Sequence, residues 1–251
     1  MTEIDYVDSE SEGFTIYRGD FLELYKKLLN TADLVLTDPP YMLTSGGKGG
    51  KPLYDGARRM SGCFHHSNYE NRGNIVTCDI GWKDMMMPMY ECLKEGGHAY
   101  FMADSKNQLD MQNYAKSAGF KFHNLLYWDK GTCTPNRWYM KNAEYVGFFY
   151  KGRAKSINYC SAKQGVNIPH TDETKHPTEK PVALMEYYIK NSTKEGDIVF
   201  DPFMGTGTTG VAALRLNRRF IGIEIEQTWF DIAHKRIMQA RHNLQGNFFQ
   251  K

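Results

Sequence analysis

The chain has 251 residues, of which 41% are hydrophobic and 24% charged, and its formal net charge is +2. This composition is ordinary for a soluble globular protein and excludes disorder throughout, and the length suffices for one large α/β domain with a full core. Apolar runs of the roughly 18 residues that a membrane-spanning helix requires are absent, so we expect a cytoplasmic protein without a membrane partner.

The N-terminal segment and the cysteines suggest nothing specialised. Residues 1–12 are acidic and lack the apolar segment of a signal peptide, and we interpret them as a frayed tail. The five cysteines are scattered, which favours reduced thiols over a disulfide framework. Cys63, His65, His66 and Cys78 match no standard zinc spacing, so no metal is expected.

Strand and helix patterns alternate along the chain. Strands are expected at residues 14–17, 34–37, 98–102, 120–128, 145–150, 197–200 and 219–223. Helices are expected at residues 21–29, 82–93, 106–118, 182–190, 208–216 and 228–241. The alternation predicts an α/β fold, with a mostly parallel seven-stranded sheet and helices on both faces, in a single domain over residues 1–251.

Two long polar stretches, residues 42–78 and 151–176, interrupt this pattern. Positive charge gathers in both, and such local patches can follow a phosphate backbone even on a nearly neutral protein. Solvated loops are the alternative interpretation. The basic residues concerned include Lys48, Lys51, Arg58 and Arg59 in the first stretch and Lys151, Arg153, Lys155 and Lys163 in the second.

The sequence DLVLTDPPY at residues 33–41 runs from a predicted strand into an acid, two prolines and a tyrosine. Because proline fixes φ and restricts the residue before it, Asp38, Pro39, Pro40 and Tyr41 should form a stiff, extended segment at the end of a buried strand. The segment offers a carboxylate, carbonyl oxygens without helical partners and an aromatic face. A structural turn capped by the tyrosine is the alternative.

A glycine-rich loop follows a later strand, in DIVFDPFMGTGTTG at residues 197–210. Gly205, Gly207 and Gly210 form a G-x-G-x-x-G pattern before a helix, and Glu224 ends the next strand. This pattern is typical of dinucleotide sites. That interpretation leaves the DPPY segment unexplained, and only one more strand–helix unit follows. An adenosine-containing cofactor without a pyrophosphate would use the same glycines and acid.

Together, TDPPY and DPFMGTG resemble the motif pair of the S-adenosylmethionine-dependent DNA amino methyltransferases. Their order here, DPPY first and FxGxG last, resembles the β class of that family. YRGD, HPTEKP and LLYWDK…TPNRW…KNAEYVGFFYKG are further matches, and the motifs span most of residues 14–240. The resemblance implies a Rossmann-like methyltransferase fold with a circularly permuted motif order, S-adenosyl-L-methionine as cofactor and double-stranded DNA as substrate.

The resemblance also implies a cofactor site. The strands ending at Thr37 and Phe200 would flank the point where strand order reverses, so that their loops share one crevice. Glu224 would bind the ribose, and Lys180 would lie near the cofactor carboxylate. Asp20 would approach the adenine, with a helix N-cap as its alternative role, and Lys180 could instead be solvated. The full set is Asp20, Thr178, Lys180, Pro181, Asp201, Phe203, Gly205, Gly207, Thr208 and Glu224.

The DPPY segment fits the acceptor chemistry that the resemblance implies. An exocyclic amine is a poor nucleophile, and acceptors at its N–H groups favour the charge that builds up as it attacks. Asp38 would accept one hydrogen bond and the Pro39 carbonyl another, while Pro40 stiffens the segment and Tyr41 stacks the flipped base. In the family that the sequence resembles, an acid at the first position goes mostly with adenine N6, so adenine N6 is the expected target. Cytosine N4, an RNA methyltransferase and a non-catalytic DNA-binding relative are the alternatives.

DNA contacts are expected from the two polar stretches, of which residues 151–176 occupy the place of the family's target-recognition region. Solvated loops remain the alternative for residues 136–141. The family implies that homodimers are common and leaves open a cognate restriction nuclease that need not be physically bound. The candidate DNA-binding residues are Lys48, Lys51, Arg58, Arg59, Asn136, Arg137, Lys141 and Arg153.

Overall fold

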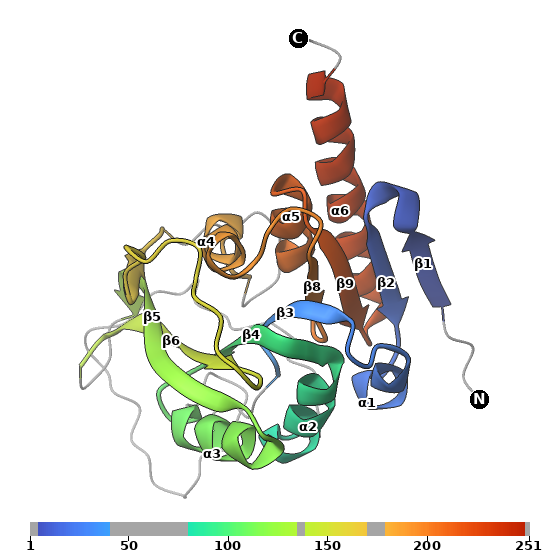
Figure 1. The fold of residues 1–251 in the computed structure, drawn as a ribbon. Helices are drawn as coiled ribbons and strands as arrows, with labels where there is room; N and C mark the ends of the chain where they lie inside the picture. The colour runs from blue at the N-terminus through green and yellow to red at the C-terminus, as the bar shows by residue number, and fades with distance from the viewer. Residues whose placement is uncertain (1–4, 41–79, 135–138, 170–178, 249–251) are drawn as a thin grey trace, which may run out of the picture.

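The computed structural model describes residues 5–40, 80–134, 139–169 and 179–248. Across these ranges, one large sheet lies between two layers of helices (Figure 1). None of the helices within them is both long enough and apolar enough to cross a membrane.

The described part of the sheet has nine strands in the order β1-β2-β9-β8-β3-β4-β6-β5-β7. The five strands from β2 to β4 in that order run parallel, β6 is antiparallel to both of its neighbours, and β1 and β7 are short edge strands. The strand bounds are Asp5–Ser9 (β1), Phe14–Arg18 (β2), Ala32–Thr37 (β3), Leu93–Ala103 (β4), Lys121–Thr134 (β5), Lys141–Tyr150 (β6), Gly165–Asn167 (β7), Ile198–Asp201 (β8) and Arg219–Glu224 (β9).

Helices cover both faces of this sheet. The group α1, α2 and α3 packs on one face and the group α4, α5 and α6 on the other (Figure 1). Two short 3-10 segments, Glu10–Glu12 and Tyr25–Lys27, join neighbouring elements. The helix bounds are Phe21–Leu24 (α1), Trp82–Cys92 (α2), Gln108–Ala118 (α3), Val182–Ser192 (α4), Thr208–Arg215 (α5) and Gln227–Phe248 (α6).

The central strand β3 shows why the sequence forms this architecture. Leu34 and Leu36 are fully buried against the α4–α6 face, whereas Val35 is fully buried against the α1–α3 face. Side chains of a strand point alternately to opposite faces, so a strand covered on both sides needs a continuous apolar run. The α/β fold with a mostly parallel sheet is therefore confirmed.

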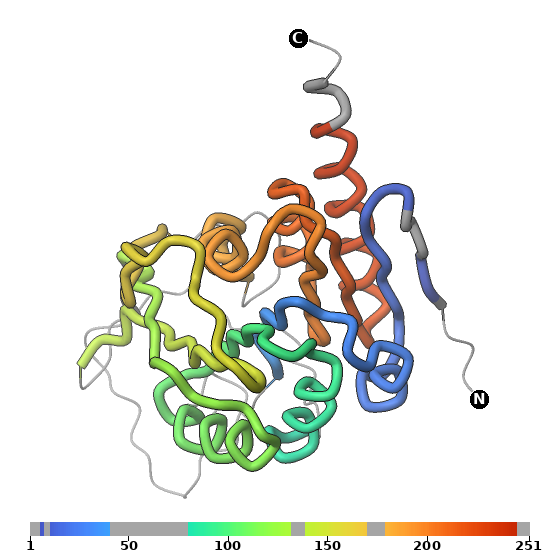
Figure 2. The backbone as a smooth tube through the Cα atoms, in the orientation of Figure 1, coloured from blue at the N-terminus to red at the C-terminus, as the bar shows by residue number. Residues whose placement is uncertain are grey.

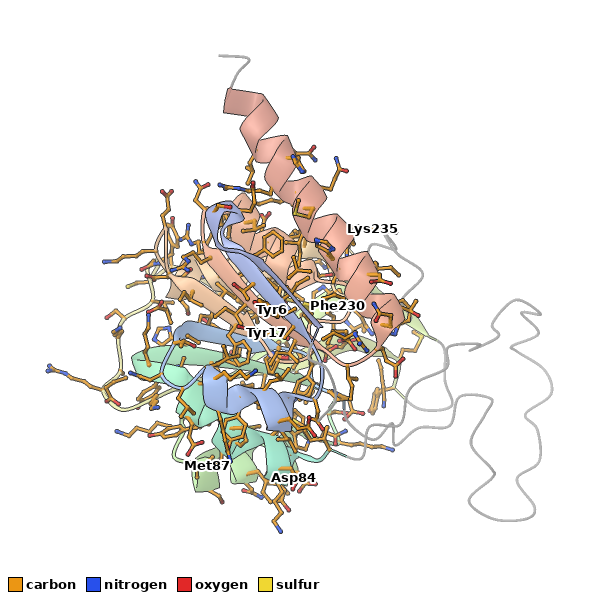
Figure 3. The ribbon with its side chains drawn as sticks, turned by 90° about the vertical axis from the view of Figure 1, so that its right-hand side faces the viewer. Tyr6, Tyr17, Asp84, Met87, Phe230 and Lys235 are labelled. Atoms are coloured by element: carbon orange, nitrogen blue, oxygen red, sulfur yellow. The ribbon has the colours of Figure 1, made fainter. Side chains whose placement is uncertain are left out.

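Three details differ from the sequence-based expectations. Residues 1–12 are not simply a frayed tail, because Asp5–Ser9 forms β1, which pairs antiparallel with β2. The ring of Tyr6 stacks on that of Tyr17 with their centroids 6.0 Å apart (Figure 3). Together with β7, this strand raises the expected seven strands to nine.

The C-terminal helix extends further than its amphipathic pattern predicted. It runs to Phe248 rather than ending near residue 241. The red turns of α6 in Figure 2 rise beyond the neighbouring strands. Among the residues whose side chains are described, Leu244 is the last of α6 that packs on the core, and Ala233, Ile237 and Ala240 anchor the helix on the sheet.

Candidate active site

The sheet reverses its strand order between β3 and β8. Strand β3 pairs with β4 on one side, where Thr37 lies beside Phe101, and with β8 on the other, where Val35 lies beside Phe200. Both pairs are parallel, so the loops after β3 and β8 leave from the same edge of the sheet. Ligands in open α/β sheets bind at such a point. This arrangement of the strands ending at Thr37 and near Phe200 matches the prediction.

Asp201 fastens these two loops to each other. Its Oδ1 accepts hydrogen bonds from the Thr37 hydroxyl at 2.7 Å and from the Phe203 amide at 3.1 Å, and its Oδ2 accepts one from the Thr209 hydroxyl at 2.6 Å. Burial raises the pKa of Asp201 to about 6, although these hydrogen bonds oppose the rise. Both oxygens of Asp201 serve the protein's own loops and the residue is only 3% exposed, and its cofactor contact stays a prediction.

The glycines of the glycine loop allow it to pack closely against α6. Gly205 and Gly207 have φ of +52° and +77°, which side chains adopt with strain. A Cβ on Gly207 would lie 3.0 Å from the Cβ of Ala233 and 3.1 Å from Cδ1 of Ile237, both on α6. The missing side chain of Gly207 therefore leaves room for α6. A contact of Gly207 with the cofactor stays a prediction.

Glu224 lies at the end of β9 beside this loop. Its Oε2 accepts from the Gly205 amide at 3.0 Å and its Oε1 from the Glu226 amide at 2.8 Å. Burial raises the pKa of Glu224, and these amides oppose the rise. A carboxylate has about four acceptor positions, so Glu224 retains capacity for a pair of ribose hydroxyls.

Asp20 lies at the same edge, because the Gly19 amide donates to the Glu224 carbonyl at 3.0 Å. Its Oδ1 accepts from the Leu22 amide at 2.8 Å and so caps α1, as the alternative interpretation predicted. The residue is exposed, and contact with an adenine ring stays a prediction. The Phe203 ring, on the neighbouring loop, packs edge-on against Phe21 at 5.5 Å.

No sequence motif indicated the contact that holds Glu179 to the glycine loop. Arg236 of α6 forms an ion pair of 2.8 Å with Glu179, whose side chain is 2% exposed. The same guanidinium donates to the Thr206 carbonyl at 2.9 Å and to the Thr208 hydroxyl at 3.3 Å. Pro181 follows as the buried N-cap residue of α4. One side chain thus links three segments of the site.

Lys180 is buried, which contradicts the alternative of a solvated lysine. Its ammonium donates a hydrogen bond to Asp38 Oδ2, and a place near the cofactor carboxylate stays a prediction. The same Nζ lies 3.4 Å from Glu144 Oε2. Asp38 Oδ1 is buried and has no hydrogen-bond partner among the described residues. Burial raises the pKa of Asp38, Lys180 lowers it and Glu144 raises it, and the net result is a raised pKa.

The structure describes only some of the remaining predicted residues. Pro39 and Pro40 follow Asp38 at the proposed catalytic edge, which is the edge of the sheet where the loops after β3 and β8 begin. Pro39 is buried. Lys141 is exposed at the start of β6, three residues before Glu144. Several predicted residues and zinc candidates lie outside the described ranges: Tyr41, Lys48, Lys51, Arg58, Arg59, Cys63, His65, His66, Cys78, Asn136, Arg137 and Thr178.

Arg153 lies at the opposite edge of the sheet. Its amide donates to Glu95 Oε1 at 3.2 Å, and the neighbouring Lys151 donates to the carbonyls of Tyr90 and Leu93, at the beginning of β4. The register sets Thr37 beside Phe101, six residues after Glu95. At roughly 3.3 Å per strand residue, Arg153 is about 20 Å from the catalytic edge. The structure therefore places Arg153 far from Asp38, and its contact with DNA stays a prediction.

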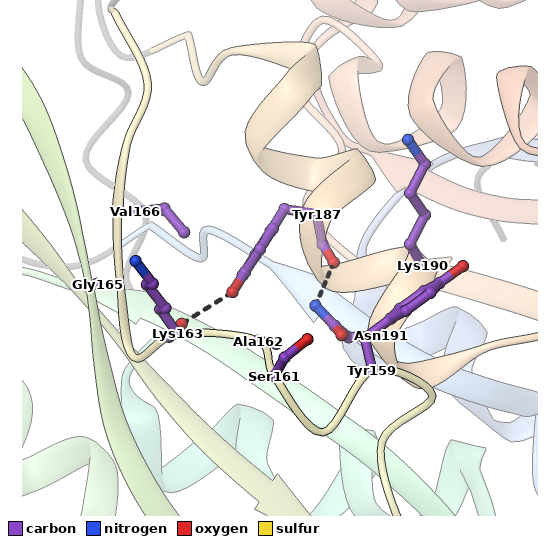
Figure 4. A pocket seen from close by; sticks show the side chains of 9 residues that line it. All are labelled: Tyr159, Ser161, Ala162, Lys163, Gly165, Val166, Tyr187, Lys190 and Asn191. Carbon is purple, nitrogen blue, oxygen red and sulfur yellow. Dashed lines mark hydrogen bonds between the residues drawn. The ribbon is translucent and has the colours of Figure 1, made fainter.

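No group of three or more His, Cys, Asp or Glu side chains that could hold a metal ion occurs in the described ranges. A pocket of about 370 Å³ lies between α4 and the segment around β7 (Figure 4). The hydroxyl of Tyr187 donates across it to the Lys163 carbonyl at 2.9 Å. Its lining contains none of the predicted catalytic or cofactor residues.

Comparisons with known proteins agree with the geometry. A sequence model described as DNA methylase matches residues 32–235. The Type II methyltransferase M2.DpnII of Streptococcus pneumoniae is 31% identical, over 88% of each chain. M2.MboI of Moraxella bovis is 26% identical and covers 98% of this chain and 95% of its own. The crystal structure of an M1.HpyAVI–SAM complex superposes with a TM-score of 0.67 at 26% identity, over 89% of this chain and 99% of the other.

Proposed function

The chain belongs to the DNA methylase family of N6/N4 amino methyltransferases, and from this membership we propose that it methylates the N6 amine of adenine at a specific site in duplex DNA. The methyl donor is S-adenosyl-L-methionine, which supplies an electrophilic methyl group on a sulfonium. The residues of this chain would bind the cofactor, orient the target base and activate its amine for the transfer.

The observation that supports the proposal best is the open oxygen of Asp38. Its Oδ1 is buried and unpartnered among the described residues, at the edge where the two loops meet. A buried carboxylate oxygen without a donor is unfavourable unless a ligand supplies one. The N–H of an exocyclic amine is such a donor, and the Pro39 carbonyl would accept the second N–H. Both acceptors stabilise the positive charge that develops on the amine nitrogen.

The cofactor would bind at the glycine loop after β8 and at the end of β9. Glu224 would accept the two ribose hydroxyls, and the loop of Gly205 would bring its backbone close to the methionine part. Asp20 and the Phe203 loop border the adenine side. Asp201 and Arg236 would act as positioning residues, because each holds loop segments in place through hydrogen bonds to the protein. Orientation of the donor and acceptor then accounts for much of the rate.

Adenine is preferred to cytosine as the target because, in this family, an acid at the first position of the DPPY segment goes mostly with adenine. A carboxylate accepts a stronger hydrogen bond from the amine than a hydroxyl does. The likeness to the cytosine-N4-specific PvuII methyltransferase, at 17% identity and a TM-score of 0.67, bears on the fold alone. The proposal also covers a role in restriction–modification, since relatives are named Type II methyltransferases. A homodimer is compatible with it, and a cognate nuclease would act without binding to this chain.

One experiment tests the target base. The protein is incubated with S-adenosylmethionine and duplex DNA of mixed sequence, and the DNA is digested to nucleosides for mass spectrometry. We expect N6-methyladenine. N4-methylcytosine alone would overturn the choice of base, and transfer to RNA but not to DNA would overturn the substrate.

A matched pair of variants tests the role of Asp38. Asp38→Ala should bind the cofactor normally in isothermal titration yet lose transfer by roughly 100-fold or more, because an acceptor at the amine is missing. Glu195→Ala is the control, since Glu195 is exposed in a turn before β8, at the opposite edge of the sheet. Turnover near the wild-type value in Asp38→Ala would remove the residue from the catalytic role.

A further inference from the structure

We propose that Glu144 is a positioning residue of the transfer site, which draws the Lys180 ammonium away from Asp38 when the target base enters. The proposal rests on the proposed function, because it concerns how the acceptor of the base becomes available. Glu144 lies within the segment KNAEYVGFFYKG, but no role was assigned to it from the sequence.

The strand pairing explains how Glu144 reaches the site. On β6 it lies directly opposite Trp128 of β5, and the Trp128 side chain is buried on the α4–α6 face of the sheet. Opposite residues of an antiparallel pair project to the same face. Lys180 lies just before α4, on that same face. The three elements therefore bring the Glu144 carboxylate to the Lys180 ammonium, 3.4 Å away.

Two carboxylates thus share one buried ammonium. The Lys180 side chain is 7% exposed, and its Nζ contacts Asp38 Oδ2 and Glu144 Oε2. The second oxygen of Glu144 lies 3.2 Å from Lys130 Nζ. Four charged groups are therefore nearly neutral as a set. The ammonium can move from one carboxylate to the other without leaving its negatively charged surroundings.

The position of this ammonium matters for the reaction. In the structure it is closer to Asp38 than to Glu144. During methyl transfer the amine nitrogen next to Asp38 gains positive charge, and a second cation on the same carboxylate would oppose that gain. An ammonium held by Asp38 also weakens its oxygens as acceptors. Glu144 provides the alternative partner that lets Lys180 withdraw while staying buried and paired.

The isosteric variant Glu144→Gln removes this alternative partner. We expect kcat for DNA methylation to fall by roughly 10-fold or more, because Lys180 stays on Asp38. The KM for S-adenosylmethionine should stay within about twofold, since the ion-pair partners of Glu144 among the described residues, Lys130 and Lys180, lie outside the glycine loop. Glu195→Gln, in the exposed turn, is the matched control and should leave both values unchanged.

A double variant separates this role from a merely structural one. If Glu144 acts by attracting Lys180, Lys180→Met combined with Glu144→Gln should recover several-fold of the activity that Glu144→Gln loses, at alkaline pH where Asp38 stays ionised. If Glu144 only supports the fold, the double variant will be no more active than the single one, and the proposal is then wrong.

A readout without turnover distinguishes failure of this inference from failure of the proposed function. The groups around Asp38 are Lys180, Glu144 and, behind it, Asp201, with Lys130 beyond Glu144. Removing the Glu144 charge should lower the pKa of Asp38, which carbon-13 NMR titration of the protein without DNA measures. An unchanged titration of Asp38 contradicts the inference even if the wild type methylates adenine. A lowered pKa in a protein that methylates no DNA would overturn the proposed function alone.

Discussion

The hydroxyl of Thr37 donates a 2.7 Å hydrogen bond to Asp201, a residue 164 positions further along the chain. Thr37 ends β3 immediately before the DPPY segment, and Asp201 ends β8 immediately before the glycine loop. One buried contact therefore sets the spacing between the proposed acceptor loop and the proposed cofactor loop. Because methyl transfer requires the two reacting groups in contact, this spacing is a condition for activity.

The variant Thr37→Val tests that contact. Valine has nearly the same shape but donates no hydrogen bond, so it leaves Asp201 with one donor fewer in a site that excludes water. We expect the free energy of unfolding to fall by about 1–3 kcal/mol. Transfer should fall more than cofactor affinity does. Urea denaturation, isothermal titration and a tritium-transfer assay measure the three quantities, and Thr37→Ser should retain most of each.

The titration of Asp201 should appear in the pH dependence of stability. Its pKa is raised from 3.8 to about 6 in the folded protein, chiefly by burial. The folded state thus holds the proton more firmly than the unfolded state. This contribution to stability is full below pH 3.8 and is lost as the pH rises through about 6. In Asp201→Asn, the free energy of unfolding measured by urea denaturation should not show this decrease between pH 3.8 and about 6. The same pH dependence in both proteins would contradict the raised pKa of Asp201.

Gly207→Ala should destabilise the fold before it affects the cofactor directly. The new Cβ would press on Ala233 at 3.0 Å, and φ is +77°. We expect a loss of about 1–3 kcal/mol in the free energy of unfolding. Gly196→Ala is the matched control, because Gly196 has φ of +83° but nothing within 4 Å of a Cβ. Equal losses for the two variants would show that packing on α6 contributes nothing.

The ion pair of Arg236 with Glu179 should contribute far more than an exposed pair does. Arg236→Met removes this partner from a nearly buried carboxylate, and we expect a loss of about 3–5 kcal/mol in the free energy of unfolding. The control is Arg241→Gln, which breaks the more exposed 3.2 Å pair with Glu12 and should cost less than about 1 kcal/mol. Similar losses in chemical denaturation would contradict a special role for Arg236.

The two described DNA-contact candidates should differ in DNA binding. Lys141 is exposed on the catalytic edge, whereas Arg153 lies at the opposite edge. Lys141→Ala should weaken duplex binding and reduce the slope of log affinity against log salt by about 1. Arg153→Ala should leave both unchanged. Fluorescence anisotropy at several salt concentrations gives both values, and a loss for Arg153→Ala alone would place the DNA on the other edge.

The sequence by itself determined the elements and the loops that carry the chemistry. The apolar run of β3 specified a strand covered on both faces, and the prolines after Asp38 and the glycines after Asp201 marked loops at strand ends. These features depend on the periodicity and dihedral limits of neighbouring residues, which act over a few positions. Where parallel strands carry such loops, the edge at which they meet follows from the general architecture of α/β sheets.

Only the tertiary structure decided which side chains meet at that edge. The contact between Lys180 and Asp38 joins residues 142 positions apart, and local pattern carries no information at that distance. The same holds for Glu144 beside Lys180, and for Arg236, which reaches back from α6 to Glu179. It also holds for Arg153, because the register of β4 against β6 places it far from Asp38. Pairing and packing of whole elements set these contacts, since charged groups near a buried site must find partners wherever the fold brings them.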